Sequence, residues 1–159
     1  MISQKLQNAI NKQINAEMWS ANLYLAMAFS LRAQGYDGMA GWLMHQAEEE
    51  NEHAGKMADF LFKRGGRALV GAVAEVVNDY KDPMQAFEAV YAHERKVSSM
   101  IDALVALAQQ EKDYAAEEFL RSFVREQIEE EDNAAGIVEA LKLANGLYIF
   151  VDQKLGARK

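Results

Sequence analysis

The chain has 159 residues and half of them are hydrophobic, which is enough for one globular domain with a sizeable core. It contains no cysteine, which excludes disulfides, zinc–thiolate sites, iron–sulfur clusters and cysteine nucleophiles. The formal net charge of −7 repels nucleic-acid phosphates and attracts cations, so we expect no nucleic-acid partner. No apolar run approaches the ~20 residues of a membrane span, and the first residues lack a signal-peptide apolar region. We therefore expect a cytoplasmic protein with no membrane contact.

Four long helices are predicted, because the single proline and most of the ten glycines lie between periodic stretches and not inside them. We expect Asp37 to cap the second helix. Asp82 should cap the third, where Pro83 at the first helical position and Gln85 three residues past the cap strengthen the prediction. The helices are predicted over about 3–34, 37–64, 82–112 and 113–145.

The link between the second and third helices, residues 65–81, is much longer than the usual connection of about 2–8 residues. At ~3.3 Å per extended residue it can span the whole bundle, so the third helix is expected to run parallel to the second. The two short links make antiparallel neighbours. The long link is also apolar, so it should lie against its own bundle or a neighbouring subunit. We predict a single all-α domain over 1–159, with a four-helix bundle over about 3–145 and one long crossover between helices 2 and 3.

A short fifth helix is predicted at the C-terminus, over about 147–156. About ten residues do not make a stable helix in isolation, so its apolar face needs a partner. The partner is either another subunit or its own bundle, and the sequence leaves both open. The face consists of Leu147, Phe150, Val151 and Leu155.

Six polar residues interrupt the apolar faces of the four long helices, where steps of three and four mark the buried side of a bundle. They form two sets, and each member of the second set lies 77 positions after its counterpart in the first. Counted along their helices, the first two members lie about 21 Å from the same end of the bundle, so the residues are expected to meet at one height. The first set is Glu17, Glu50 and His53, and the second is Glu94, Gln127 and Glu130.

Four carboxylates inside a bundle need a compensating charge, because an isolated ionised carboxylate in a low-dielectric core costs many kcal/mol. No lysine or arginine lies near them on the same helix faces. Two divalent cations would balance the charge, and oxygen ligands with one imidazole suit iron or manganese. His53, three residues after Glu50, lies on the same helix face and is aimed at the same ion. The sequence therefore predicts a buried two-metal site.

Further residues lie beside this predicted site. Glu49, Glu126 and Glu129 flank it, and with Glu130 they would hold a third, more exposed cation; a solvated acidic face is the alternative. Tyr24 follows Glu17 by seven residues. It is either a core tyrosine that hydrogen-bonds a carboxylate or a participant in redox chemistry.

These residues together resemble the non-haem bacterial ferritins, and the match covers nearly the whole chain, including the crossover and the terminal helix. Two departures are informative. Where a bacterioferritin has a second Glu-x-x-His, this chain has Gln127-x-x-Glu130, and Glu52 stands where a haem-binding methionine would be, so we expect no haem. The residues that carry the resemblance are Glu17, Tyr24, Glu50-x-x-His53, Glu94 and Gln127-x-x-Glu130.

The resemblance implies a ferritin-like fold, a homo-oligomeric shell of 24 subunits and a ferroxidase centre in each subunit. Fe²⁺ would be oxidised by dioxygen or hydrogen peroxide and stored as a ferric mineral in the cavity. The first iron would be held by Glu17, Glu50 and His53. The second would be held by Glu50, Glu94 and Glu130, with Glu50 bridging, Gln127 as a weak or indirect ligand and Tyr24 beside the pair. A third iron would be held by Glu49, Glu126, Glu129 and Glu130.

Two other functions fit a bundle with an acidic interior. One is a diiron oxygenase or peroxidase, which would need a pocket for an organic substrate. The other is a non-catalytic bundle that binds divalent ions for stability. For the function that the ferritin resemblance implies, the sequence does not show whether dioxygen or hydrogen peroxide is the oxidant.

Overall fold

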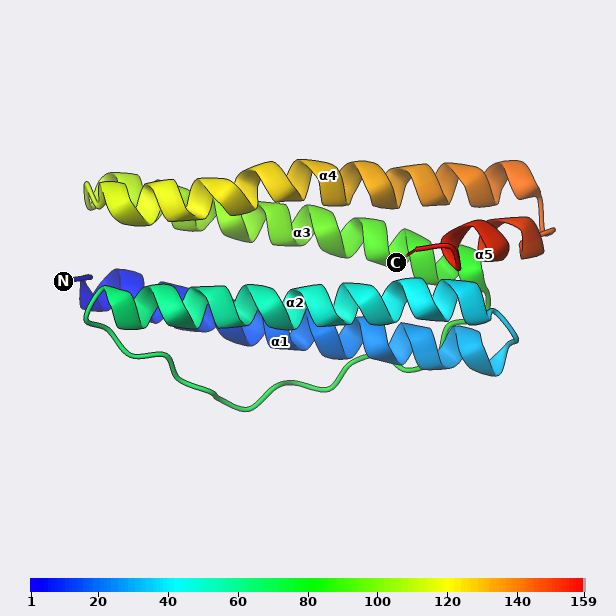
Figure 1. Cartoon of the computed structure of the whole chain (residues 1–159), viewed down its shortest axis with the longest axis horizontal. Helices are drawn as coiled ribbons and strands as arrows, with labels where there is room; N and C mark the ends of the chain where they lie inside the picture. Colours follow the sequence, from blue (N-terminus) through cyan, green and yellow to red (C-terminus); the bar gives the residue numbers. More distant parts are fainter. Residues whose placement is uncertain (159) are drawn as a thin grey trace.

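The computed structural model describes residues 1–158, and within them it contains five helices and no strand. Helices α1 to α4 lie side by side in one long bundle, and α5 folds back at one end (Figure 1). This confirms the predicted all-α fold with a long crossover and a short fifth helix, and the predicted bounds agree to within two residues. The helices are α1 (Gln4–Ala33), α2 (Asp37–Lys63), α3 (Pro83–Gln110), α4 (Tyr114–Ala144) and α5 (Ile149–Leu155).

The helix starts follow local capping chemistry, with one exception to the prediction. Asp82 caps α3 as expected, since its carboxylate accepts a hydrogen bond of 2.8 Å from the backbone N–H of Gln85. The prediction that Asp37 caps α2 is wrong. The amide of Ala40 already bonds to the carbonyl of Tyr36, so the helix begins one residue earlier and Asp37 is its first helical residue. A carboxylate in the first turn still interacts favourably with the helix dipole.

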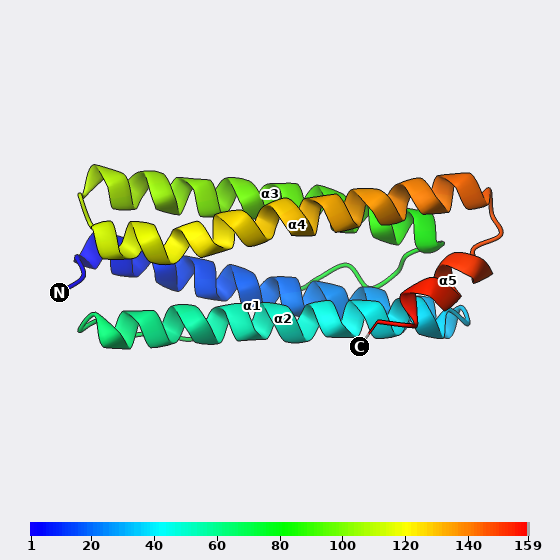
Figure 2. The ribbon, with the colours of Figure 1, turned by 45° about the horizontal axis from the view of Figure 1, so that its top comes forward.

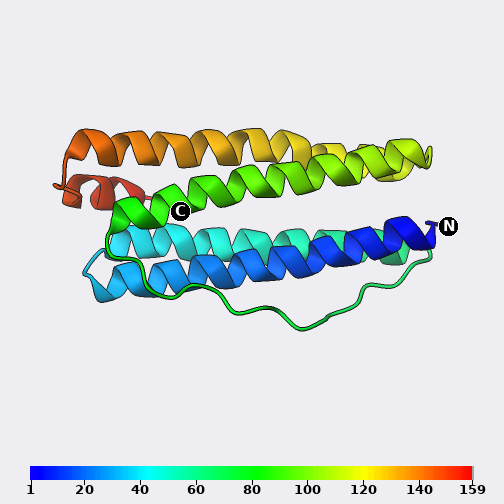
Figure 3. The ribbon, with the colours of Figure 1, turned by 180° about the vertical axis from the view of Figure 1, so that it is seen from behind.

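The crossover runs in extended form along α1 and delivers α3 to the opposite end of the bundle, so that α3 runs parallel to α2 (Figure 3). Side chains of α1 hold it there. Asn11 and Asn15, one turn apart, donate hydrogen bonds of 2.9 Å to the backbone carbonyls of Arg67 and Ala72. The crossover therefore lies on its own bundle, but polar contacts fix it more than apolar burial does. The apolar side chains that it leaves exposed are Leu69, Val70 and Val77.

The interior of the bundle is divided into two apolar clusters with a polar layer between them. One cluster includes Met27, Leu43 and Phe87, and the other includes Leu6 and Leu120. The buried polar side chains lie between the two clusters along every long helix, so the polar layer crosses the middle of the bundle. These side chains are Gln13, Glu17, Ser20, Gln46, Glu50, His53, Glu94, Gln127 and Glu130.

Helix α5 packs against α2, so of the two alternatives for its partner the structure shows its own bundle. The backbones approach so closely that a Cβ added at Gly38 would lie 2.0 Å from the carbonyl oxygen of Asp152, so only glycine fits there. The Asp152 carboxylate also accepts a 2.8 Å hydrogen bond from the amide of Met39. Of the predicted apolar face, Val151 is buried and Leu155 packs against the core. The two remaining residues, Leu147 and Phe150, are exposed.

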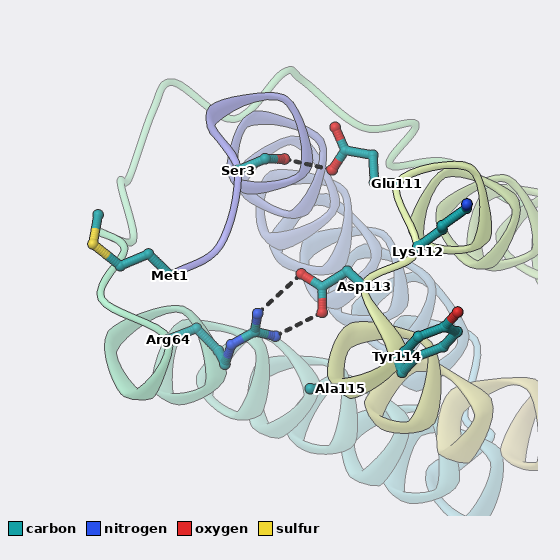
Figure 4. Close-up of a pocket in the computed structure, with 8 residues that line it drawn as sticks. All are labelled: Met1, Ser3, Arg64, Glu111, Lys112, Asp113, Tyr114 and Ala115. Carbon is teal, nitrogen blue, oxygen red and sulfur yellow. Dashed lines mark hydrogen bonds and ion pairs between the residues drawn. The ribbon is translucent and has the colours of Figure 1, made fainter.

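The end of the bundle where α1 begins is held by an ion pair. Both terminal nitrogens of the Arg64 guanidinium, Nη1 and Nη2, donate to the carboxylate of Asp113, at 2.9 and 3.0 Å (Figure 4). Beside it, Ser3 donates to Glu111, and these residues line an open hollow of about 620 Å³. This hollow lies a full apolar cluster away from the polar layer, so it is not part of the carboxylate site. Within residues 1–158, no helix combines the length and apolar character that crossing a membrane requires.

Candidate metal centre

The first half of the polar layer brings together Glu17 from α1 and Glu50 and His53 from α2. All three are at most 4 % exposed, and each offers one ligand atom such that these atoms lie within 4.8 Å of one another. His53 Nδ1 is 3.8 Å from Glu17 Oε2 and 3.5 Å from Glu50 Oε2. Neither of these oxygens accepts a hydrogen bond from a described residue. Buried polar atoms are nearly always satisfied, so two unpartnered carboxylate oxygens beside an imidazole nitrogen fit a divalent cation.

The other ring nitrogen of His53 is already occupied. His53 Nε2 lies 2.9 Å from Glu126 Oε1 of α4, and because an ionised carboxylate only accepts, the nitrogen carries the proton. A metal-binding histidine typically donates its second N–H to a carboxylate in this way, which fixes the ring and leaves the other nitrogen for the metal. The bond from His53 also lowers the pKa of Glu126. Glu126, predicted as a ligand of a third cation, thus lies in this structure as the partner of His53.

In the second half of the layer, from α3 and α4, both carboxylates accept hydrogen bonds. Glu94 accepts from the hydroxyl of Tyr24 and from Gln127 Nε2, the latter at 3.1 Å. Glu130 accepts a bond of 2.9 Å from Gln46 Nε2. All of these side chains are buried. The structure therefore places every residue of the two predicted sets, together with Tyr24, in one layer.

Burial and mutual repulsion change the protonation of these groups. Burial, reinforced by Glu17, raises the pKa of Glu50 well above its usual value, and burial raises that of Glu94 to about 7 and that of Glu130 as well. Burial alone would lower the pKa of His53, but its hydrogen bond with Glu126 and the nearby carboxylates of Glu17 and Glu50 outweigh burial and raise the pKa to about 12. Burial also acts to raise the pKa of Glu17, yet the neighbouring Glu50 and His53 and the hydrogen bond from Gln13 lower it overall. His53 is thus cationic near neutral pH, and a cation bound at Nδ1 must displace its proton.

Comparison with known proteins shows the family of the chain. The model of the ferritin-like domain family matches residues 7–144. The chain belongs to this ferritin-like domain family. It is 52 % identical over 159 residues to the bacterial non-heme ferritin of Bacteroides fragilis, covering 99 % of this chain and 100 % of that protein. It is 35 % identical over 160 residues to a probable bacterial non-heme ferritin-like protein of Haemophilus influenzae, covering 98 % and 96 % of the two chains.

Solved structures give the same result. The ferritin-like fold of this chain matches a novel open pore ferritin from Archaeoglobus fulgidus with a TM-score of 0.98 and 44 % identity, and each chain is covered in full. An engineered closed form of that archaeal ferritin matches with a TM-score of 0.97 and 45 % identity. The predicted resemblance to bacterial non-haem ferritins is confirmed.

Two glutamines of the ferritin-like centre were not among the predicted site residues. Gln13 Nε2 donates a 3.0 Å bond to Glu17 Oε1, and Gln46 holds Glu130. Both glutamines are buried, at 4 % and 2 % exposure. Their positions carried a recognisable pattern, because each lies one helical turn before a predicted ligand, Glu17 or Glu50, on the same helix face.

The outer glutamates are not gathered around a common point in this structure. Among the described residues, the group that satisfies the ligand spacing is Glu17, Glu50 and His53. Glu49 is partly exposed and pairs with Arg158 at 2.7 Å, and Glu129 is exposed. A third cation would therefore have to draw these side chains away from their present partners, and the third site stays a prediction.

Proposed function

We propose that the chain, as one domain over 1–159, is an iron-storage protein of the cytoplasm that oxidises Fe²⁺ and holds Fe³⁺ as a mineral inside a shell of 24 subunits. The pair of unpartnered carboxylate oxygens on Glu17 and Glu50, facing His53 Nδ1, is the observation that carries the proposal. Membership of the ferritin-like domain family and the ferritin relatives support it.

Iron is the substrate of the proposed reaction. The first Fe²⁺ binds to Glu17, Glu50 and His53, and the second to Glu50, Glu94 and Glu130, with Glu50 shared. Two ions bridged in this way lie about 3.5–4 Å apart, close enough for a joint two-electron step. Each ion gives up one electron. One dioxygen takes both electrons with two protons to give hydrogen peroxide, or one hydrogen peroxide takes them with two protons to give two waters.

The product has to leave the centre, because storage requires many turnovers. Fe³⁺ is harder than Fe²⁺ and hydrolyses readily, so it moves toward the cavity once one ligand swings away. Glu130 is our candidate for that ligand, since it would also take part in the proposed third, outer site. Glu49, Glu126 and Glu129 lie on the outer side of the same helices and would receive the ion. Gln127 holds Glu94 and acts as a weak or indirect ligand.

The decisive experiment replaces the shared ligand. Glu50→Ala should abolish rapid Fe²⁺ oxidation and leave the helical circular dichroism unchanged, because a buried carboxylate is removed without disturbing the apolar clusters. Oxygen consumption after addition of Fe²⁺ measures the rate. Glu52→Ala is the matched control, since Glu52 lies two residues away on the same helix and is exposed. Oxidation by Glu50→Ala at the wild-type rate would refute the assignment.

Assembly is tested by the native mass with and without iron. Twenty-four subunits of 17.8 kDa would have a mass of about 430 kDa before loading. The exposed apolar side chains of Phe29, Val70 and Leu143 support burial against neighbouring subunits. A large particle that keeps gaining iron in air distinguishes storage from a structural bundle, which would bind about two ions per subunit and stop.

A further inference from the structure

Arg158 connects the segment after α5 to the metal centre. Beyond α5 the chain turns back beside α2 (Figure 2), where the close approach of Gly38 to Asp152 fixes its course. The Arg158 guanidinium lies over the ring of Trp42, with 4.8 Å between Cζ and the ring centroid. Its Nη1 donates a 3.0 Å hydrogen bond to the backbone carbonyl of Trp42. Two independent contacts thus hold this side chain, which is 23 % exposed.

The second terminal nitrogen of Arg158 reaches the polar layer. Nη2 lies 2.8 Å from Gln46 Oε1 and 2.7 Å from Glu49 Oε1. A guanidinium has only donors, so the oxygen of the Gln46 amide must face Arg158. The amide nitrogen of Gln46 then faces the other way and donates to Glu130 Oε2 at 2.9 Å. The three side chains form a chain of hydrogen bonds with one possible direction, from Arg158 through Gln46 to Glu130.

We propose that Arg158 is a positioning residue of the metal centre, which fixes the Gln46 amide so that Glu130 keeps one oxygen hydrogen-bonded and presents the other to a cation. The inference rests on the proposed function, because it concerns the cation that Glu130 binds. Residues that orient metal ligands in this way commonly affect metal affinity by about 10–100-fold when they are mutated. Arg158 acts through one intervening side chain, so its effect should be smaller.

Loss of Arg158 has a specific consequence at the second cation. Without a donor on its oxygen, the Gln46 amide is no longer held in one orientation. In the flipped orientation its oxygen faces the Glu130 carboxylate and repels it, and the hydrogen bond to Glu130 is lost. Glu130 loses a donor that stabilises its ionised form, so a cation bound there is held less tightly. The first cation should be unaffected, since its ligands Glu17 and His53 are not part of this hydrogen-bond chain.

The test is a calorimetric titration of the assembled, metal-free protein with Co²⁺, whose visible absorption also reports the ligand environment. In Arg158→Ala the affinity for the second Co²⁺ should fall about five- to tenfold, while the affinity for the first stays at the wild-type value. Arg158→Lys, which keeps a donor, should recover part of the loss. Lys154→Ala is the matched control, because Lys154 is an exposed cation on the same segment, and it should leave both affinities unchanged.

A double-mutant cycle shows whether Arg158 acts through Gln46. Gln46→Leu should weaken the second Co²⁺ by about tenfold, and adding Arg158→Ala to it should cause no further loss. An unchanged second affinity in Arg158→Ala, or a full additional loss in the double variant, overturns the inference while the proposed function stands. A wild-type protein that fails to bind even the first Co²⁺ overturns the proposed function itself.

Discussion

The two halves of the candidate metal centre have the same residue spacing in the sequence, but their carboxylates differ in how far hydrogen bonds satisfy them. In the α1/α2 half, Glu17 and Glu50 each keep a buried oxygen that no described residue satisfies, and His53 Nδ1 faces both. In the α3/α4 half, Tyr24 and Gln127 donate to Glu94, and Gln46 donates to Glu130. The first half leaves two buried oxygens open to a cation, whereas each carboxylate of the second half already accepts a hydrogen bond.

This difference implies an order of filling. An unsatisfied buried oxygen costs free energy that a cation recovers, so the first ion should bind tightly to the α1/α2 half. The second ion gains less, because it replaces hydrogen bonds that already stabilise Glu94 and Glu130. A tight and a weaker site suit a centre that must accept two ions and then release its product.

The largest expected effect comes from removing a carboxylate of the α1/α2 half, and the matched change in the α3/α4 half should have a much smaller effect. Glu17→Gln should weaken the first cation by about 1000-fold, since breaking a buried charge pair costs about 4 kcal/mol. Glu94→Gln should leave the first cation unchanged and weaken the second by about tenfold, because an amide can still accept from Tyr24. Titration of both variants with Co²⁺ measures the two affinities. Equal losses of the first cation in both variants would remove the distinction between the halves.

The second effect is a pH dependence of the metal-free protein. Glu94 has a pKa of about 7 when folded against 4.5 for the ordinary carboxyl, so it stabilises the fold below pH 4.5 and this stabilisation is lost as the pH rises through 7. The loss amounts to roughly 3 kcal/mol per subunit. The raised pKa of His53 acts in the same direction, with stability present below pH 6.5 and lost as the pH rises above it.

Thermal unfolding of the metal-free protein at pH 5 and pH 7.5 measures this dependence. In the wild type the midpoint of unfolding should be lower at pH 7.5 than at pH 5. The decrease should be smaller in Glu94→Gln, whose side chain cannot ionise at that position. Saturating Co²⁺ should remove most of the difference, because the cation stabilises the ionised carboxylates. A midpoint that rises with pH in the metal-free protein would contradict the assigned protonation states.

The fold and the two ligand sets could be predicted because both follow from periodicity. The constant spacing of 77 residues between the sets, with Glu50 matching Gln127 and His53 matching Glu130, means that each helix pair separates its polar residues by the same distance along the chain. The side of a helix on which a residue lies is fixed by its position in the turn, so polar residues on an apolar face must be buried. The long crossover then determines the direction of α3.

The residues that were missed depend on contacts between distant segments, which periodicity does not encode. Gln46 and Arg158 are more than a hundred positions apart, and they meet because Gly38 lets α5 approach α2 closely. The bond between His53 and Glu126 likewise depends on how α2 and α4 are set against each other. Helix spacing indicates which face a side chain occupies, but not which of several nearby acceptors it will choose.

The smallest expected effect separates the two roles left open for Tyr24. Its side chain is fully buried, and burial together with the charge of Glu94 raises its pKa well above the usual value, so the hydroxyl stays protonated and donates to Glu94. Tyr24→Phe should therefore weaken the second cation about fivefold, the worth of about 1 kcal/mol for a hydrogen bond, and leave the first unchanged. At saturating Fe²⁺ the oxidation rate should stay within about threefold of wild type.

Comparing the rate at limiting and at saturating Fe²⁺ tells binding from electron transfer. A tyrosine that only orients Glu94 changes the iron concentration needed for half-maximal rate, because more Fe²⁺ compensates for a weaker second site. A tyrosine that supplies an electron would lower the rate at every iron concentration, and its loss could not be compensated in this way. Tyr91→Phe provides the control, because Tyr91 lies one turn before Glu94 on α3 and its ring faces the guanidinium of Arg95. A rate at saturating Fe²⁺ that falls more than about tenfold with unchanged affinities would give Tyr24 a redox role and make the α3/α4 half more than a weaker copy of the first.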